Sequence, residues 1–341
     1  ATDPIAAGDN DLRMTNARTP TGAAGGDLGG TYPNPAVAKI QGTAVSATPP
    51  SSGQILKFDG AQWAPQAAPG GGSYATAVVA APTGVGVTDR AAMQSAIDAL
   101  PAGGGRVVLR EGIYVLDDVA INLKSNLLIA GQGQGTVLRL PNVGSLVKKV
   151  FSTATGELSG ITVRDLSFDY SASTGTQHPR IYGADFAVKG FGFEDVKFFG
   201  FNQSGASPVY QIFEAQGTEA EFINCVFDGN DRARFAFGGA LLTTKVVRLR
   251  GCRFSKPGST VFRFIDTTDL SELKVMDCAI DVGNKSITGI YMTCPGEVVG
   301  CKIQNIGGTS LAIEASSDMK AVGNHCFYGV SSDSLAPIQI S

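Results

Sequence analysis

The stretch Asn224-Cys225-Val226-Phe227 recurs three times toward the C-terminus, as Gly251-Cys252-Arg253-Phe254, Asp277-Cys278-Ala279-Ile280 and Gly300-Cys301-Lys302-Ile303. The four cysteines are 27, 26 and 23 residues apart. Related segments at 165–168, 195–198 and 324–327 extend the series to seven copies. A period of roughly 20 to 30 residues, built around a turn residue and short apolar runs, is typical of a solenoid.

Strand alternation assigns each position of the repeat to one face of a sheet. Asp, Asn or Gly always precedes the cysteine position, and these residues tolerate a left-handed backbone, which predicts one bend per coil. Two columns are apolar throughout and are predicted to face inward: Val163, Phe193, Phe222, Leu249, Val275, Val298 and Val322, then Phe168, Phe198, Phe227, Phe254, Ile280, Ile303 and Phe327. The residues directly after the cysteine position are predicted to face outward: Ser167, Lys197, Val226, Arg253, Ala279, Lys302 and Cys326.

A third short strand in each coil is indicated by apolar runs at 210–213, 261–264, 287–291 and 311–313. Three parallel strands per coil and stacked identical side chains predict an all-β fold, the right-handed parallel β-helix. Across neighbouring coils, Glu221 is expected to pair with Arg248 and Lys274 with Glu297. Such exposed pairs contribute only about 0 to 1 kcal/mol each.

The composition suits a large, turn-rich β protein, with 44 glycines and 17% charged residues among 341. The formal net charge of −3 argues against nucleic acid as a partner, and no apolar run approaches the roughly 20 residues that span a bilayer. We expect no membrane insertion. The N-terminus lacks the basic and apolar regions of a secretory signal, so we expect synthesis in the cytoplasm.

The repeated cysteines are expected to be reduced and to act as small buried side chains, because an aligned stack fits disulfide geometry poorly. His325 falls in the same column of the last copy and is predicted to be a core histidine. No Cys-x-x-Cys pair is present and the chain has two histidines, so we expect no metal and no cofactor.

Before the solenoid, residues 1–66 are rich in Gly, Ala, Pro, Thr and Asn, and residues 67–75 have the composition of a flexible linker. Asp59-Gly60, between an apolar run and Trp63, predicts a hairpin. Within the β-helix at 76–341, Thr88 or Asp89 is expected to cap a short helix that buries Met93, Ile97 and Leu100 over the first coil.

Two N-terminal stretches resemble bacteriophage tail fibre and tailspike proteins. They are Asp11–Gly22 (DLRMTNARTPTG), continuing through Gly25–Pro35 (GGDLGGTYPNP), and Ser52–Trp63 (SGQILKFDGAQW). The resemblance covers about the first 65 residues and implies a virion component of the phage tail, made in the host cytoplasm. It also implies a homotrimer that contacts other tail or baseplate proteins through its N-terminus. The helix and first coil look like the start of pectate-lyase-type β-helices.

The residues leave three functions open: adhesion to a host surface receptor or polysaccharide, a polysaccharide depolymerase (hydrolase or lyase), and a purely structural tail protein. Adhesion is preferred, with no catalytic residue assigned. Hydrolysis of a glycan needs two nearby carboxylates. Candidates are Glu214, Asp228, Asp231 and Asp266, whereas Arg232, Arg234, Phe199 and Phe201 are candidates for glycan contact. Asp169, Asp228 and Asp281 are aligned but are better explained as surface turns.

Overall fold

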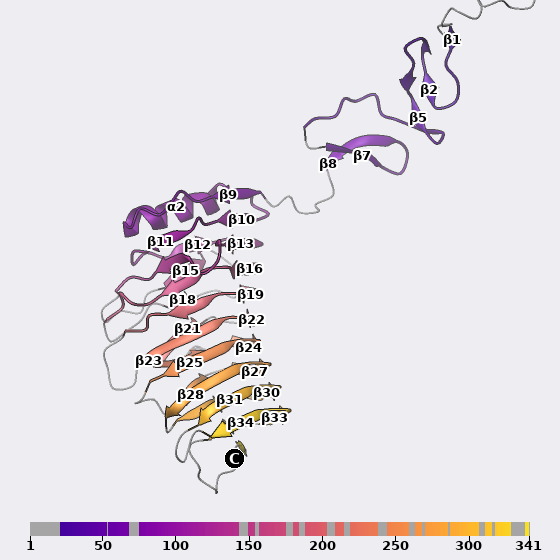
Figure 1. Ribbon diagram of the computed structural model, residues 1–341. Helices are drawn as coiled ribbons and strands as arrows, with labels where there is room; N and C mark the ends of the chain where they lie inside the picture. The colour runs from indigo at the N-terminus through magenta and orange to yellow at the C-terminus, as the bar shows by residue number, and fades with distance from the viewer. Residues whose placement is uncertain are drawn as a thin grey trace, which may run out of the picture. The chain divides into compact units, whose positions relative to one another are not determined.

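The computed structural model describes residues 21–340 except 53, 68–74, 143–148, 154–156, 175–179, 184–187, 203–208, 215–218, 238–243, 259–262, 268–269, 286, 307–310, 316–317 and 329–337. Internal contacts divide the chain into two units, residues 1–73 and 74–341. Figure 1 shows the strands of the second unit stacked in successive coils. Within the described residues, no helix combines the length and apolar character that a membrane crossing requires.

The first unit contains short antiparallel pairs. Its strands are β1 (Gly22–Ala23), β2 (Leu28–Gly29), β3 (Thr31–Tyr32), β4 (Ala36–Val37), β5 (Lys39–Ile40), β6 (Thr43–Ala44), β7 (Gln54–Phe58) and β8 (Trp63–Ala67). The predicted hairpin is confirmed, since β7 and β8 pair with Phe58 opposite Trp63. The backbone N–H groups of Gln62 and Ala61 donate to Asp59 across the turn and lower the pKa of its carboxyl group. None of the described residues 21–66 is buried.

The second unit is a right-handed parallel β-helix with three strands per coil. One face is a ten-stranded sheet of β9 (Thr76–Val78), β10 (Gly105–Val108), β13 (Leu127–Ala130), β16 (Leu158–Arg164), β19 (Val188–Glu194), β22 (Glu219–Ile223), β24 (Thr244–Arg250), β27 (Leu270–Met276), β30 (Gly296–Val299) and β33 (Met319–Val322). Each strand pairs in parallel with the equivalent strand of the next coil. This confirms the fold predicted from the repeat.

Two further ladders form the rest of the solenoid and share one long strand, β23 (Val226–Phe237). The first ladder contains β11 (Gly112–Val115), β14 (Thr136–Arg139), β17 (Ser167–Asp169), β20 (Lys197–Phe199), β23, β25 (Arg253–Pro257), β28 (Ala279–Lys285), β31 (Lys302–Ile306) and β34 (His325–Tyr328). The second contains β12 (Ile121–Leu123), β15 (Lys149–Thr153), β18 (Arg180–Gly183), β21 (Val209–Glu214), β23, β26 (Arg263–Thr267), β29 (Thr288–Met292), β32 (Ile313–Ala315) and β35 (Ile338–Ile340).

The predicted bend column is confirmed in the backbone. Asp165, Asp195, Asn224 and Asp277 have φ between 53° and 54°, and Gly251 and Gly300 have φ of 63° and 65°. Asn and Asp enter this left-handed region more readily than other residues with a Cβ, and Gly enters it without steric cost. Because each coil bends at the equivalent position of the repeat, the side chains that follow remain in register from coil to coil.

The interior is packed by the predicted columns. Phe168, Phe198, Phe227 and Phe254 stack with ring centroids 5.4, 4.8 and 4.5 Å apart. Beside them the buried thiols of Cys225, Cys252, Cys278 and Cys301 donate hydrogen bonds to backbone carbonyls of the preceding coil. All six cysteines are free. The cysteine column is therefore packing, as predicted.

The last coil departs from the predicted register by one residue. Its bend residue is Gly323, with φ of 65°, so Asn324 occupies the cysteine position. His325 pairs with Lys302 on the outer surface and Cys326 pairs with Ile303. The predictions of a core histidine, an outward Cys326 and inward Val322 and Phe327 are wrong here, since Val322 and Phe327 are 49% and 50% exposed. The alternation restarts at the bend, and this bend lies at Gly323, one residue before the predicted bend residue Asn324.

Helix α2 (Gly86–Asp98) packs on the first coil and buries Met93 and Ile97, as predicted. The predicted cap is wrong, because the helix begins at Gly86 and Val85 provides no side-chain cap. Asp89 instead lies inside the first turn, where its buried carboxylate accepts hydrogen bonds from the backbone of Thr83, Gly84 and Val115. The carboxylate therefore ties the preceding loop and β11 to the helix.

Two smaller expectations also need correction. Ser167, predicted to face outward, is buried and donates its hydroxyl to the carbonyl of Gln134 at 3.0 Å. Glu221 lies opposite Arg248 and Lys274 opposite Glu297 in the register, but neither forms the predicted ion pair. Arg248 and Arg250 reach diagonally to Glu219 and Glu221 of the adjacent strand, whereas Lys274 pairs with Glu272 on its own strand.

Candidate functional site

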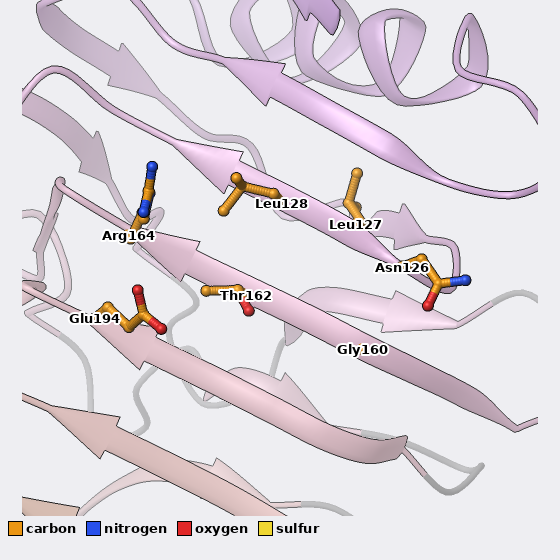
Figure 2. A pocket seen from close by; sticks show the side chains of 7 residues that line it. All are labelled: Asn126, Leu127, Leu128, Gly160, Thr162, Arg164 and Glu194. Carbon is orange, nitrogen blue, oxygen red and sulfur yellow. The ribbon is translucent and has the colours of Figure 1, made fainter. Parts of the chain in front are cut away.

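A groove of about 320 Å³ lies on the outer face of the ten-stranded sheet, over β13, β16 and β19. It is lined by Asn126, Leu127, Leu128, Gly160, Thr162, Arg164 and Glu194. Figure 2 shows the side chains of Thr162 and Arg164 on β16, that of Glu194 on the neighbouring β19, and Gly160 without a side chain. A second hollow of about 210 Å³ shares Thr162 and Glu194 and continues over β22. The two hollows form one concave surface across four coils, which we call the sheet groove.

Glycines at outward positions create the sheet groove. In Gly190-Phe191-Gly192-Phe193 the two phenylalanines are buried in the core, so alternation turns the glycines outward. Gly160 and Gly190 also have positive φ, 65° and 74°, where a residue with a Cβ would be strained. At Gly192 no such strain exists, and a Cβ would lie 3.5 Å from Thr162 Oγ1, an ordinary contact. The outer face of the sheet therefore lacks side chains at these glycines, whereas the surrounding outward positions carry long side chains.

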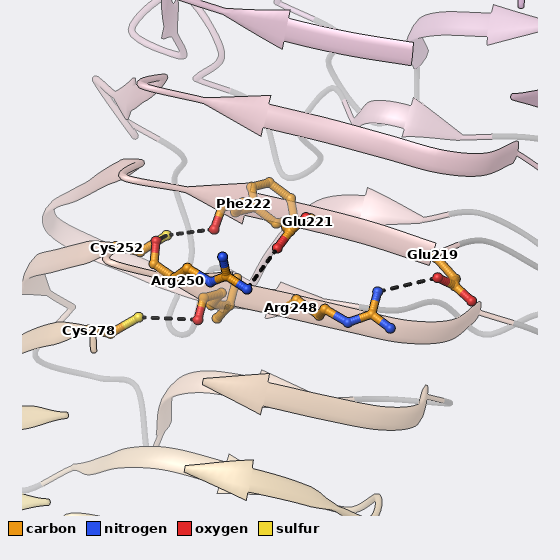
Figure 3. Close-up of polar contacts among 8 residues, drawn as sticks. Glu219, Glu221, Phe222, Arg248, Arg250, Cys252 and Cys278 are labelled. Atoms are coloured by element: carbon orange, nitrogen blue, oxygen red, sulfur yellow. Dashed lines mark hydrogen bonds and ion pairs between the residues drawn. The ribbon is translucent and has the colours of Figure 1, made fainter. Parts of the chain in front are cut away.

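Charged side chains border the sheet groove. Arg164 lies near Asp165, with Nε 3.3 Å from Oδ2. Glu219 and Glu221 pair with Arg248 and Arg250 at 3.3 and 3.7 Å, as Figure 3 shows. The carboxylate of Glu194 has neither a hydrogen bond nor an ion pair to any described residue. A shallow polar surface with an available carboxylate and a nearby guanidinium is suited to hydroxyl-rich ligands.

The predicted polar cluster lies on the other two ladders, away from the sheet groove. Glu214 ends β21 and pairs with Gly183, whereas Asp266 of β26 pairs with Ala236 of β23. These two acids are two strands apart along the ladder. Arg232 and Arg234 belong to β23 together with Asp228 and Asp231. The groove residues were not among the predicted site residues, and the Gly-Phe alternation at 190–193 was the signal that could have found them.

The aspartates of this region support turns. Asp228 Oδ1 accepts the N–H of Asn230 at 3.1 Å and Asp228 Oδ2 pairs with Lys256 at 2.9 Å. Asp231 is exposed at a positive φ of 58°. Asp169 and Asp281 accept backbone N–H groups two residues ahead in the same way, at 2.8 and 3.0 Å. Their alignment therefore follows from turn geometry.

The two phenylalanines proposed for glycan contact lie in different environments. Phe199 is half-buried, with Lys197 Nζ 5.0 Å from its ring centroid. Phe201 is completely buried and stacks on Tyr170 at 4.5 Å, which removes it from the candidates. Among the residues that the structure describes, no three His, Cys, Asp or Glu side chains gather as metal ligands would.

No family model matches the chain, and no curated protein matches its sequence. Among solved structures the chain is similar to ORF18 of Geobacillus virus E2, with a TM-score of 0.48, 16% identity and 84% of this chain covered. It is similar to PfbA, a surface adhesin of Streptococcus pneumoniae, with a TM-score of 0.46, 14% identity and 77% of each chain covered. A third is the A-module of the Azotobacter vinelandii mannuronan C-5 epimerase AlgE4, with a TM-score of 0.33, 15% identity, and 77% of this chain and 95% of that one covered. The chain spans 66% of the length of the virus protein.

Proposed function

We propose that this chain is a bacteriophage tail fibre or tailspike component that attaches to a host surface glycan through the sheet groove. The observation that carries the glycan proposal is the groove itself, an open surface of mixed polar and apolar character across four coils with outward glycines at its base. An extended polymer can lie in such a surface without a deep pocket. The virion assignment is supported by the sequence resemblance of residues 11–35 and 52–63.

We expect attachment of this kind to be multivalent, with several copies of the groove binding the same surface. A groove this shallow contributes few contacts, so a single site binds weakly. In a homotrimer three grooves engage the same surface, and each bound copy raises the effective concentration of the others. The first unit supports this proposal, because its hairpin presents Leu56 and Phe58, 46% and 44% exposed, on the same face as Trp63.

The test is binding of the purified full chain to a panel of bacterial surface polysaccharides and whole cells. Gly192→Trp fills the sheet groove at a position without backbone strain, and we expect at least a tenfold loss of affinity. Val322→Trp places the same indole at an exposed position of β33, the last strand of the ten-stranded sheet, and serves as the matched control. Equal binding by Gly192→Trp and the unaltered chain contradicts the groove assignment. No binding to any cell or polysaccharide favours the purely structural alternative.

A polysaccharide depolymerase is the second candidate, favoured by two carboxylates in the sheet groove. Glu194 of β19 and Glu221 of β22 are on adjacent strands and two positions apart, which places their Cα atoms about 8 Å from each other. Glycoside hydrolysis uses two carboxyl groups that flank the scissile bond. Their environments differ, since Glu221 pairs with Arg250 and Glu194 has no partner among described residues. Release of reducing ends that is lost in Glu194→Gln and Glu221→Gln would establish this activity, and binding without release argues for adhesion alone.

A further inference from the structure

A row of cations occupies every second coil on the outer face of the first ladder. The register places Lys197, Val226, Arg253, Ala279 and Lys302 opposite one another on five successive strands. Because neighbouring strands are about 4.8 Å apart, the positions of Lys197, Arg253 and Lys302 repeat about every 10 Å along the solenoid. We call these three residues the cation row. Small or apolar side chains separate its members.

The cation row keeps its charge. None of the three side chains forms an ion pair with a carboxylate in the described part of the chain, whereas nearby Lys256 pairs with Asp228 at 2.9 Å. Arg253 and Lys302 are exposed. The charged groups of the cation row are therefore available to bind an anion from solution.

Aromatic rings hold the two lysines of the row. Lys197 Nζ lies 5.0 Å from the ring centroid of Phe199, and Lys302 Nζ lies 5.6 Å from that of Phe327. A cation over an aromatic face is attracted without being neutralised. The rings therefore restrict the ammonium groups and leave them able to bind an anion.

A hollow of about 170 Å³ lies between Arg253 and Lys302, over the small side chain of Ala279. Ser255 and Gln304 also line it and offer a hydroxyl and an amide. Asp281 is the one acid in its lining, and it already accepts hydrogen bonds from Gly283, Gln304 and Asn305 at 3.0, 3.3 and 2.8 Å. The hollow thus joins two free cations to neutral hydrogen-bonding groups.

We propose that the cation row binds a linear acidic polysaccharide along the solenoid axis, with carboxylates on alternate sugars. The spacing of the cations is close to the length of two sugar units in an extended glycan, and the hollow at Ala279 accommodates the intervening unit. This inference goes beyond the proposed function, because it places a second glycan site on a different face from the sheet groove. The carboxylate pairs with guanidinium or ammonium, and Ser255 and Gln304 bind sugar hydroxyls.

The test measures the affinity of the full chain for four probes by calorimetry. They are hyaluronan oligosaccharides, polygalacturonate oligosaccharides, neutral dextran and inorganic polyphosphate. Of these, hyaluronan carries a carboxylate on alternate sugars. Arg253→Glu and Lys302→Glu are each expected to weaken hyaluronan binding at least tenfold. Lys320→Glu reverses a charge on the ten-stranded sheet and is expected to change it less than twofold. Thermal unfolding of each variant verifies that the solenoid is intact.

The outcomes separate this inference from the proposed function. Gly192→Trp is expected to leave hyaluronan binding unchanged, because that residue lies on the other sheet. Tighter binding of hyaluronan than of the other probes supports the spacing argument. The inference is overturned if neither acidic glycan binds, if both charge reversals leave binding unchanged, or if polyphosphate binds as tightly as hyaluronan, which indicates general attraction of anions.

Discussion

The side-chain amide of Asn324 takes the place of a thiol beneath Cys301. Its Oδ1 accepts the backbone N–H of Cys301 at 2.9 Å, and its Nδ2 donates to the carbonyl of Val298 at 2.8 Å. In the coil above, the thiol of Cys301 donates to the equivalent carbonyl, that of Val275. The column of cysteines therefore ends in a residue that satisfies a backbone N–H as well as a carbonyl, whereas the cysteine thiols bond to carbonyls.

Asn324→Ala is expected to destabilise the last coil, because it removes both hydrogen bonds and leaves the N–H of Cys301 and the carbonyl of Val298 without these partners. The cost should be about 1 to 3 kcal/mol. Asn324→Cys should recover part of it through a thiol-to-carbonyl bond. Urea unfolding of the two variants checks the order, and equal stability of Asn324→Ala and the unaltered chain contradicts it.

Gly300 and Asp277 are expected to be coupled. A Cβ on Gly300 would clash with Asp277 Oδ1, and Gly300 also has a positive φ of 65°. Gly300→Ala should therefore destabilise the protein by strain and by this clash. Asp277→Gly removes the carboxylate and keeps the left-handed bend, so it should offset part of the cost of Gly300→Ala. A double-mutant cycle measures the coupling, and strictly additive effects contradict the contact.

Alkaline pH should weaken the cysteine column. The hydrogen bond with Cys252, followed by burial, raises the pKa of Cys278 to about 12 from a reference of 9.0. The pKa values of Cys252 and Cys301 are also raised, mainly by the neighbouring thiol. Because the folded values lie above the unfolded ones, this stabilisation is complete below about pH 9 and is lost as the pH rises toward 12.

Urea unfolding between pH 7 and 11 checks this dependence. Cys278→Val, which cannot ionise at that position, should show a shallower loss of stability above pH 9 than the unaltered chain. A thiol reagent at neutral pH should modify the five buried cysteines, the four of the column and Cys294, only after denaturant is added. Rapid modification of any of the four column cysteines in the native protein contradicts their packing role, whereas the partly buried Cys326 does not bear on it.

The hairpin of the first unit should govern oligomer formation. Leu56, Phe58, Trp63 and Pro65 share one face of the β7–β8 ribbon, and Lys57 lies on the other. An isolated two-stranded hairpin is marginal in water, so this face needs a partner. Phe58→Asp is expected to lower the mass of the trimer proposed above, and Lys57→Asp serves as the control. Light scattering measures both, and a trimer that survives Phe58→Asp contradicts this interface.

Local rules explain how much of the fold could be predicted. The bend at Asp165 or Asn224 depends on backbone sterics, and the Phe column depends on alternation, so both are readable from one coil. The last coil was misassigned because Asn324 and Phe327 match the bend and aromatic positions of the repeat, whereas the bend at Gly323 sets the register. The sheet groove was not predicted, because the densest run of polar residues in the sequence lies at Asp228 and its neighbours. The three-dimensional structure is needed to show that Lys256 pairs with Asp228. It is also needed to show that the missing side chain at Gly192 opens a hollow on the ten-stranded sheet.

The bend residues Asn224, Gly251, Asp277, Gly300 and Gly323 are separated by 27, 26, 23 and 23 residues, yet the strands of the ten-stranded sheet remain aligned. The differences in length must then fall in the connections between strands. Each coil contacts mainly its neighbours, so one connection can lengthen without disturbing the others. Peptides inserted in the connections between strands should therefore be displayed at chosen positions along the solenoid axis. A one-residue insertion inside a strand would instead shift the register of that strand against the neighbouring coils.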